Sequence, residues 1–362
     1  MPLKKPVGMS AIAMPVERQG SFHMSETGSF SQNNFTIGKN GITQSPLLQG
    51  EVTSLRLDQL ELGPQLGRGA SAKVYLAMHR PTGKPVALKV LENELESNTE
   101  SRRLLLNEIK LVYNARSDHL LTFYDAFLVE GKIYLALEYM DRGSVESLFE
   151  LARQSGQLLP ENVLANLLVQ ILDGLTYLHK EQHAVHRDLK PANVLINSFG
   201  SCKLSDFGVS KQLGSTHALA ETQVGTTAYM SPERIRADAY AYASDIWSFA
   251  IIALEGALGG FPYPEFTSYF DVVKKVVDGP VPTEDPAVQQ RLPPELCDLV
   301  HACLSKDPSQ RPDVLALMRH VYVMRHQSAP IDLGAWLRQN LPPPEGAPVY
   351  EVQIQTQASM DM

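Results

Sequence analysis

Two short motifs in the middle of the chain constrain its fold and chemistry more than any other feature. The first is the run HRDLKPAN at residues 186–193, and the second is the run SDFG at residues 205–208. The first places an aspartate, a lysine and an asparagine in one loop, and the second delivers another aspartate from the next strand. Together these are the polar groups that a metal-assisted phosphoryl transfer requires. The alternative, a charged surface loop followed by a chance turn, does not account for both motifs in this order and spacing.

The chemistry of phosphoryl transfer explains the choice of residue types. Because the reaction needs little covalent help, catalysis depends on positioning and on neutralising charge at the phosphate oxygens. We expect Asp188 to orient the acceptor hydroxyl and take its proton, and Lys190 to reach the transferred phosphate. Asn193 and Asp206 offer hard oxygen ligands, which suit Mg²⁺ held mainly through nucleotide phosphates. The sequence therefore predicts a kinase that uses ATP and Mg²⁺.

A glycine-rich turn between two strand-like runs is a candidate phosphate-binding loop. It runs from Leu66 to Val74 and contains Gly67 and Gly69, where backbone amides can approach a phosphate without a side chain in the way. The third glycine expected in such a loop is Ala72, which we expect to slow nucleotide handling without abolishing it. We assign Leu66, Gly67 and Gly69 to the nucleotide site.

A strand lysine and a helix glutamate follow the turn. Lys89 lies in the run VALKV at residues 86–90, where we expect it to contact the α- and β-phosphates. A helix is predicted over residues 99–114, and Glu108 on that helix is placed to form an ion pair with Lys89. Most lysine–glutamate pairs lie on the surface and contribute little to stability. We assign a role to this pair because the other catalytic motifs are also present in the sequence.

A connector after the strand over residues 132–140 predicts a cleft between two lobes. Nucleotides bind in clefts of this kind. We expect backbone groups near Glu138 and Met140 to bind the adenine edge, with Leu137 at the back of the pocket. The apolar side chains expected to enclose the ring are Val74, Ala87 and Leu195.

The chain divides into three parts on composition and periodicity. Residues 1–59 are rich in polar residues and predict a mobile tail. Residues 60–325 predict an α+β domain, with a small antiparallel-sheet lobe over residues 60–140 and a mainly helical lobe over residues 144–325. The helical lobe includes an all-round apolar helix over 244–257 that is too short to span a bilayer. Residues 326–362, with several prolines, predict a C-terminal tail.

Charge and hydropathy exclude some partners and compartments. The net charge is 32 minus 40, or −8, which argues against nucleic acid as a partner. The sequence contains no apolar run of the length of a membrane span and no signal-peptide pattern. We expect a monomer in the cytoplasm, with entry into the nucleus left open.

Residues 60 to about 325 resemble the protein kinase family, with every motif above in the family's order. The resemblance implies the two-lobed kinase fold. It also implies that Glu233, in the run SPE at residues 231–233, pairs with Arg311, and that Asp245 supports the catalytic loop from below. A further implication is an apolar column of four side chains, which are Val112, Phe123, His186 and Phe207.

Within the family, the activation segment resembles that of the MAP kinase kinases. Lys190 after Asp188, together with Thr226, is typical of the serine/threonine branch. The runs DFGVSKQL at 206–213 and VGTTAYMSPERI at 224–235 resemble the MAP kinase kinases, which phosphorylate threonine and tyrosine in the activation loop of a MAP kinase. The resemblance implies a downstream MAP kinase substrate and an upstream MAP kinase kinase kinase.

Two threonines in the activation segment are candidate phosphorylation sites. Thr216 and Thr222 are separated by five residues, a spacing that resembles the plant and protist type of MAP kinase kinase. Phosphate on either would add about two negative charges facing Arg187 and would order the loop. The alternative is that both are plain loop residues.

The extreme N-terminus carries a candidate docking motif. Lys4 and Lys5 are followed after a short spacer by Ile12 and Met14. Two cations and alternate apolar side chains suit an extended segment lying on an acidic and apolar patch of a partner. MAP kinase kinases carry a motif of this kind, although incidental composition is the other interpretation.

Two other functions remain open at this point. One is a general serine/threonine kinase of the same cascade group. The other is a non-catalytic scaffold with a kinase fold, which the substitution at Ala72 favours. The intact residues Lys89, Asp188 and Asp206 argue against the scaffold.

Overall fold

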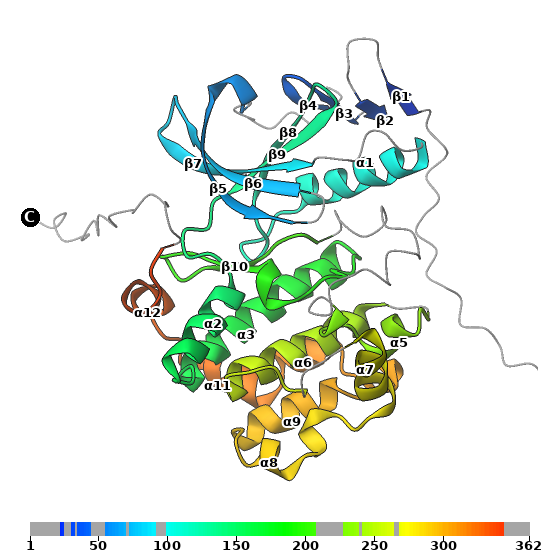
Figure 1. Ribbon diagram of the computed structural model, residues 1–362, viewed down its shortest axis with the longest axis vertical. Coiled ribbons are helices and arrows are strands. Elements are labelled where there is room, and N and C mark those ends of the chain that lie inside the picture. Colours follow the sequence, from blue (N-terminus) through cyan, green and yellow to red (C-terminus); the bar gives the residue numbers. More distant parts are fainter. Residues whose placement is uncertain are drawn as a thin grey trace, which may run out of the picture.

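The computed structural model describes residues 22–24, 30–32, 35–44, 55–69, 72–91, 99–207, 227–238, 241–263 and 268–343. These residues form a smaller lobe built on a sheet and a larger, mainly helical lobe, stacked one above the other in Figure 1. Residues 139–144 lead from the last strand of the smaller lobe into the first helix of the larger lobe. The predicted α+β class with two lobes is confirmed.

The smaller lobe is built on a five-stranded antiparallel sheet with the strand order β5-β6-β7-β9-β8. Its strands are β5 (Leu60–Arg68), β6 (Ala72–His79), β7 (Lys84–Leu91), β8 (Phe123–Val129) and β9 (Lys132–Glu138). Side chains alternate between the two faces of a strand. In β7, Val86 and Leu88 are buried, whereas Ala87 and Lys89 lie on the other face and are only half-buried.

One helix of the smaller lobe, α1 (Thr99–Asn114), lies against this sheet (Figure 1). Leu105, Ile109 and Val112 share one helix face and are 0%, 0% and 7% exposed. This buried stripe fixes the side of α1 that meets the sheet, and Glu108 lies next to the stripe. The helix has the bounds that the sequence predicts.

Four short strands precede the main sheet and form an antiparallel sheet of their own in the order β1-β2-β3-β4. They are β1 (Phe22–Met24), β2 (Phe30–Gln32), β3 (Phe35–Gly38) and β4 (Gly41–Gln44). Phe35 and Ile37 are 4% and 0% exposed, and β3 and β4 lie against β8. The prediction of a mobile tail over residues 1–59 is therefore wrong for residues 35–42. Two apolar side chains at alternate positions bury enough surface to hold this hairpin in place, although its neighbours are polar.

The larger lobe is assembled around one buried helix. Its helices are α2 (Val145–Ser155), α3 (Glu161–Thr176), α5 (Pro232–Ile235), α6 (Tyr242–Leu258), α7 (Tyr269–Val272), α8 (Pro286–Gln289), α9 (Pro294–Cys303), α10 (Val314–Met318), α11 (Val321–Ser328) and α12 (Leu333–Asn340). In α6, Trp247 and Phe249 are both 0% exposed. The predicted buried helix over 244–257 is confirmed, because a helix that is apolar all round must be covered on every side.

The catalytic loop over residues 186–193 lies between α3 and a small hairpin, and the motif with Asp206 follows that hairpin. The apolar stripe of α3 is buried along its length, and the chain continues through a wide helical turn over Tyr177–Glu181 before it enters the loop. After the loop come β10 (Val194–Ile196) and β11 (Cys202–Leu204), which pair antiparallel. Because both flanks of the loop are fixed, its polar side chains are held in defined positions.

The last helix, α12, packs on the larger lobe beside β10 (Figure 1). Leu333, Leu337 and Leu341 repeat every four residues and are 3%, 0% and 5% exposed. Arg142, in the connector between the lobes, donates from Nη1 to the carbonyl oxygen of Leu341 at 2.8 Å. The prediction of a C-terminal tail over residues 326–362 is therefore wrong for the helical part up to Leu341.

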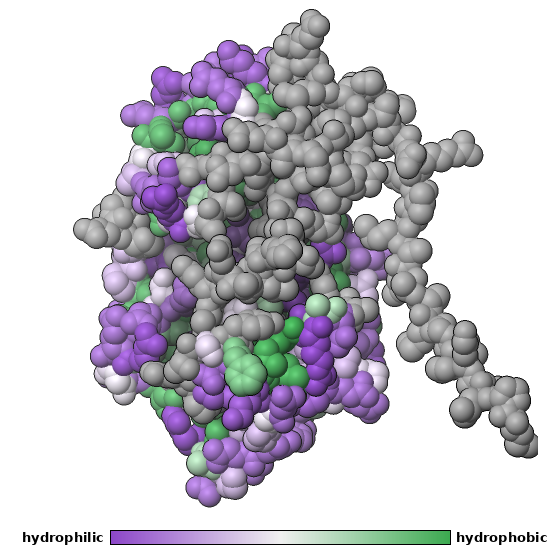
Figure 2. All heavy atoms as spheres, turned by 45° about the vertical axis from the view of Figure 1, so that its right-hand side comes forward, coloured by the Kyte–Doolittle hydropathy of each residue, from purple (hydrophilic) through white to green (hydrophobic). Residues whose placement is uncertain are grey.

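Figure 2 shows one face of the molecule. Among the atoms coloured by hydropathy on that face, most are hydrophilic, with smaller hydrophobic areas between them. Within the part of the chain that the structure describes, no helix has the length and apolarity needed to cross a lipid bilayer.

Candidate active site

Two of the predicted catalytic side chains and one predicted metal ligand meet in the loop between α3 and β10. Lys190 Nζ lies 3.3 Å from Asp188 Oδ2. Asn193 Nδ2 donates to the backbone carbonyl of Asp188 at 2.7 Å and to Asp188 Oδ2 at 3.1 Å. The side chains of Asp188 and Lys190 are 15% and 21% exposed, so both are enclosed but still accessible from the cleft. The structure thus brings a carboxylate, an ammonium group and an amide together at one point.

A buried aspartate on α6 supports this loop. Asp245 accepts hydrogen bonds from the backbone N–H of His186 at 2.8 Å and of Arg187 at 3.0 Å. Arg187 has a φ of 69°, a left-handed conformation that is costly for a non-glycine residue. His179 Nε2 lies 2.9 Å from the same carboxylate. The predicted supporting role of Asp245 is confirmed, and His179 is a further partner that the sequence motifs did not single out.

The ionisation of this cluster follows from its burial. Burial alone would raise the pKa of Asp245, but hydrogen bonds and charge from His179 and His186 bring it below its ordinary value. Burial lowers the pKa of His186, although Asp245 and Asp188 oppose that effect. Asp245 is therefore a charged acceptor for the two backbone N–H groups of the loop.

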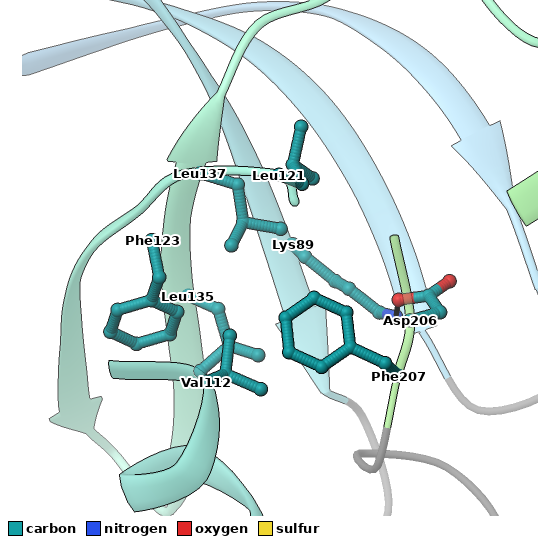
Figure 3. Close-up of a pocket in the computed structure, with 8 residues that line it drawn as sticks. All are labelled: Lys89, Val112, Leu121, Phe123, Leu135, Leu137, Asp206 and Phe207. Atoms are coloured by element: carbon teal, nitrogen blue, oxygen red, sulfur yellow. Dashed lines mark hydrogen bonds and ion pairs between the residues drawn. The ribbon is translucent and has the colours of Figure 1, made fainter. Parts of the chain in front are cut away.

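Asp206 reaches the cleft from the end of β11 and meets the strand lysine. Lys89 Nζ lies 2.5 Å from Asp206 Oδ1. Figure 3 shows these two side chains approaching each other from opposite lobes. Asp206 has a φ of 56°. This left-handed turn lets the carboxylate face the cleft while Phe207 next to it is 2% exposed.

Glu108 is not the partner that the structure records for Lys89. Among the described residues, the ion pair of Lys89 is with Asp206, and none joins it to Glu108. The predicted Lys89–Glu108 ion pair is therefore absent from this arrangement. In this conformation the ammonium group of Lys89 is directed at Asp206, and Glu108 has an interaction of its own.

A small cavity lies behind the lysine (Figure 3). The residues that line it are Lys89, Val112, Leu121, Phe123, Leu135, Leu137, Asp206 and Phe207. Three members of the predicted apolar column, Val112, Phe123 and Phe207, are thus around one space. The fourth, His186, has its ring centroid 6.3 Å from that of Phe207. Three members of the predicted column therefore border one cavity, and the fourth has its ring near that of Phe207.

Some of the residues predicted to bind the nucleotide lie on neighbouring strands of the five-stranded sheet. Gly69 N–H donates to the carbonyl of Ala72 at 2.8 Å, which closes the glycine-rich turn. A Cβ atom added at Gly67 would meet nothing within 4 Å, so a phosphate has room there. Leu137 on β9 pairs with Ala87 on β7. The residue expected at the back of the adenine pocket therefore lies beside one of the residues expected to cover the ring. The apolar residues predicted for the nucleotide site that are half-buried are Leu66, Val74, Ala87, Leu137 and Leu195.

A polar network at the connector was missed by the sequence motifs. The Glu138 carboxylate accepts from Thr122 Oγ1 at 2.6 Å and lies 2.7 Å from Lys203 Nζ. Thr122 precedes β8 in the smaller lobe, whereas Lys203 lies on β11 in the larger lobe. The side chain of Glu138 therefore joins the two lobes, while its backbone N–H donates to the carbonyl of Thr122 at 2.8 Å. No motif signals this role, because it depends on three separate segments.

The end of the activation segment is fixed to the larger lobe. Arg311 forms two hydrogen bonds of 2.8 Å with the Glu233 carboxylate, as the resemblance predicts. Burial would raise the pKa of Glu233, but hydrogen bonds from Arg311 and Ser244 lower it to about 2. Tyr229 O–H donates to Glu255 on α6 at 2.6 Å. These contacts anchor the segment that follows the candidate phosphorylation sites.

Some predicted site residues lie outside the described part of the chain. These are the candidate phosphorylation sites Thr216 and Thr222, and the candidate docking residues Lys4, Lys5, Ile12 and Met14.

Comparisons with known proteins agree with the geometry. A family model of the protein kinase domain matches residues 60–323. Mitogen-activated protein kinase kinase SIPKK of Nicotiana tabacum is 35% identical over 343 residues, covering 91% of this chain and 94% of that protein. Mitogen-activated protein kinase kinase 2 of Arabidopsis thaliana is 36% identical over 341 residues, covering 90% and 92%. Protein kinase wis1 of Schizosaccharomyces pombe is 35% identical over 316 residues, covering 85% of this chain and 50% of that protein. The chain therefore belongs to the protein kinase family and, within that family, to the MAP kinase kinases.

Proposed function

We propose that this MAP kinase kinase transfers the γ-phosphoryl group of ATP to a threonine and a tyrosine in the activation loop of a MAP kinase. It is switched on when an upstream kinase phosphorylates Thr216 and Thr222. The observation that carries the transfer chemistry is the convergence of Lys190 and Asn193 on Asp188, at 3.3 Å and 3.1 Å. The choice of substrate is supported by the relatives, which are named as MAP kinase kinases over about nine-tenths of this chain.

The donor set fits Mg²⁺ held with ATP. The Asn193 amide nitrogen is engaged by Asp188, which leaves its oxygen for a cation, and the Asp206 carboxylate is 36% exposed toward the cleft. Among the described residues, no group of three or more His, Cys, Asp or Glu side chains could hold a metal ion. Two protein oxygens completed by phosphates and water match the way Mg²⁺ is bound by kinases. The bound cation would neutralise charge on the phosphate oxygens.

Each remaining residue has a role that follows from its place. Asp188 accepts the hydrogen bond of the incoming hydroxyl, and Lys190 stabilises charge on the transferred phosphoryl group. Lys89 holds the phosphates beneath the turn of Gly67 and Gly69. The apolar cleft residues exclude water around the adenine ring, which strengthens these charged contacts.

Activation by phosphorylation is supported by the contacts of two positively charged side chains, Lys89 and Arg187. Lys89 is paired with Asp206, so Lys89 must exchange its partner for Glu108 before it can hold a nucleotide while Asp206 binds the metal. The Nε atom of Arg187 is buried and has no hydrogen-bond partner among the described residues. A phosphate on Thr216 or Thr222 would satisfy this guanidinium group and would order the activation segment against the catalytic loop.

The decisive experiment measures which residues receive phosphate. The chain carrying Thr216→Glu and Thr222→Glu is mixed with ATP, Mg²⁺ and a panel of kinase-dead MAP kinases, and phosphosites are mapped by mass spectrometry. We expect incorporation at both the threonine and the tyrosine of one activation loop. Phosphate on a general protein substrate with none on any MAP kinase loop would instead identify a general serine/threonine kinase.

A further inference from the structure

The hairpin of β3 and β4 lies outside the matched kinase domain but is packed against it. The domain begins at residue 60, whereas the hairpin covers residues 35–44. Phe35 is 4% exposed and Ile37 is not exposed at all. Burial of two large apolar side chains stabilises the docked position of the hairpin against the entropy lost on ordering it. The hairpin is therefore a bound part of the smaller lobe.

The hairpin contacts the carboxylate of Asp125, which lies on the edge strand β8. β8 is the last strand of the five-stranded sheet, so its outer edge has no neighbouring strand within that sheet. Asp125 on β8 accepts from Ile42 N–H and from Ala126 N–H, both at 2.8 Å and both through Oδ1. Gly41, with a φ of 109°, lies so close that an added Cβ would be 2.5 Å from Asp125 Oδ2. The hairpin thus docks on a side chain instead of extending the sheet.

Asp125 is enclosed as a result of this docking. Asp125 is only 6% exposed to solvent. Burial raises the pKa of Asp125 to about 6, although the N–H groups of Ile42 and Ala126 oppose that rise. Burial of the Asp125 carboxylate is unfavourable unless its oxygens accept hydrogen bonds, so Asp125 needs both N–H donors. One of the two donors, Ile42, belongs to the hairpin.

A chain of aromatic contacts leads from the hairpin toward the catalytic cleft. The Phe35 ring meets the edge of Tyr113 near the end of α1, with centroids 5.8 Å apart. Tyr113 in turn meets Phe123 on β8 edge to face, with centroids 6.0 Å apart. Phe123 lines the cavity behind Lys89, together with Phe207 and with Val112, the neighbour of Tyr113 (Figure 3). Only two ring contacts therefore separate the hairpin from the residues around Phe207.

We propose that residues 35–44 act as a positioning element for catalysis, holding the C-terminal end of α1 and the Phe123 wall of the cavity beside Phe207. Phe35, Gly41 and Asp125 are positioning residues in this device, because none of them touches the nucleotide cleft. The inference rests on the kinase activity but not on the identity of the protein substrate.

The competing explanation is that the hairpin only covers an exposed strand edge. Covering an edge protects against aggregation and adds stability, but it does not require aromatic contact with α1. The two explanations differ in what a loosened hairpin does to a folded enzyme. An edge cover changes the unfolding temperature alone, whereas a positioning element also changes turnover.

The test uses point variants of the full chain that carries Thr216→Glu and Thr222→Glu. Phe35→Ala removes the first ring contact, and Gly41→Ala drives a methyl group into the Asp125 carboxylate. Lys39→Ala is the matched control, because Lys39 lies in the exposed turn of the same hairpin. Asp125→Asn is the conservative variant, because its remaining oxygen still accepts from Ile42 and Ala126.

Turnover is measured well below the unfolding temperature of each variant, with a saturating protein substrate and with ATP titrated. We expect kcat to fall by roughly threefold to tenfold for Phe35→Ala and Gly41→Ala, and to stay within twofold for Lys39→Ala and Asp125→Asn. Hydrogen exchange should become faster at residues 108–114 and 123–128 in the first pair. These segments carry the two ring contacts that separate the hairpin from the cavity.

Two results would overturn the inference. One is an unchanged kcat for Phe35→Ala and Gly41→Ala despite a lower unfolding temperature, which would leave the hairpin as an edge cover. The other is a rise in kcat, which would make the hairpin an inhibitor. Failure of the proposed function is distinguishable, because it would appear as absent MAP kinase phosphorylation by the parent chain before any hairpin variant is compared.

Discussion

The carboxylate of Asp245, buried in the first turn of α6, accepts a hydrogen bond from the backbone N–H of His186 at 2.8 Å. The contact ties the central helix of the larger lobe to the first residue of the HRD motif. The catalytic loop is thus positioned through backbone groups, and Asp245 makes this contact without using the side chains of Asp188 and Lys190.

Asp245→Asn tests this support. An amide offers one uncharged acceptor oxygen, so one of the backbone N–H groups of His186 and Arg187 loses its acceptor and the other keeps only a neutral one. A lost bond to a buried charged acceptor costs about 1.5–3 kcal/mol. We expect kcat to fall by roughly tenfold to a hundredfold with a smaller change in KM for ATP, measured by steady-state phosphotransfer. Equal losses in kcat and in nucleotide affinity would argue for general unfolding instead.

Asp188→Asn should abolish turnover while sparing nucleotide binding. The variant keeps the size of the side chain but cannot accept the proton of the substrate hydroxyl, so we expect kcat to fall by several orders of magnitude. Fluorescent ATP-analogue titration should give a Kd close to that of the unaltered chain. Unchanged signalling in cells that carry this variant would favour the scaffold interpretation.

The Glu233–Arg311 ion pair should make stability depend on acid pH. The pKa of Glu233 is lowered from 4.5 to about 2 in the folded chain, so its contribution is complete above pH 4.5 and is lost as pH falls toward 2. The full contribution is up to about 3 kcal/mol. Urea unfolding at pH 5 and pH 3 should show that Glu233→Gln costs more at pH 5. A difference that does not shrink on acidification would contradict this assignment.

Gly256→Ala should destabilise the larger lobe. A Cβ at this position on α6 would lie 2.6 Å from Leu164 Cδ1 and 2.9 Å from Phe149 Cζ. Overpacking of this kind costs about 1–3 kcal/mol, which exceeds the gain in helix propensity. Gly260→Ala is the matched control, because its added Cβ would meet nothing within 4 Å. Thermal unfolding should separate the two, and equal melting temperatures would refute the packing argument.

Lys4→Glu with Lys5→Glu tests the docking motif. Reversing both charges should lower phosphorylation of the MAP kinase by roughly tenfold and leave phosphorylation of a general protein substrate unchanged, because only the docked substrate uses the tail. Arg18→Glu changes the charge of the same segment outside the motif and serves as the control. Equal effects on both substrates would count against a docking role.

The chemistry of the site could be predicted because it depends on residue types that have no substitute. Asp188, Lys190 and Asn193 lie within six positions of one another, so a short local motif already implies that they meet. Lys89 and Asp206 are far apart in sequence, and their meeting follows from the order of the motifs. The pairing of Lys89 with Asp206 in place of Glu108 could not be predicted, because it reflects which of two carboxylates the ammonium group meets in this conformation.

The two ends of the folded region were harder to predict. The hairpin has only two buried apolar residues, Phe35 and Ile37, in a polar segment, and such a short alternation also occurs by chance. The leucines of α12 follow a break at Pro330 and precede a run of prolines, so the composition favours a tail. In both places the deciding factor is a surface of the kinase domain that accepts the segment, and that surface exists only after folding.

The packing of α12 has a practical consequence for anyone who wishes to shorten the chain. A truncation at residue 323, where the match to the protein kinase domain ends, would remove Leu333, Leu337 and Leu341. The loop beside β10 would then be exposed. The shortened protein would expose apolar surface and would therefore be prone to aggregation and difficult to express. Arg142 would also lose its hydrogen-bond acceptor, the carbonyl oxygen of Leu341. The smallest well-behaved fragment therefore extends from about residue 35 to about residue 343.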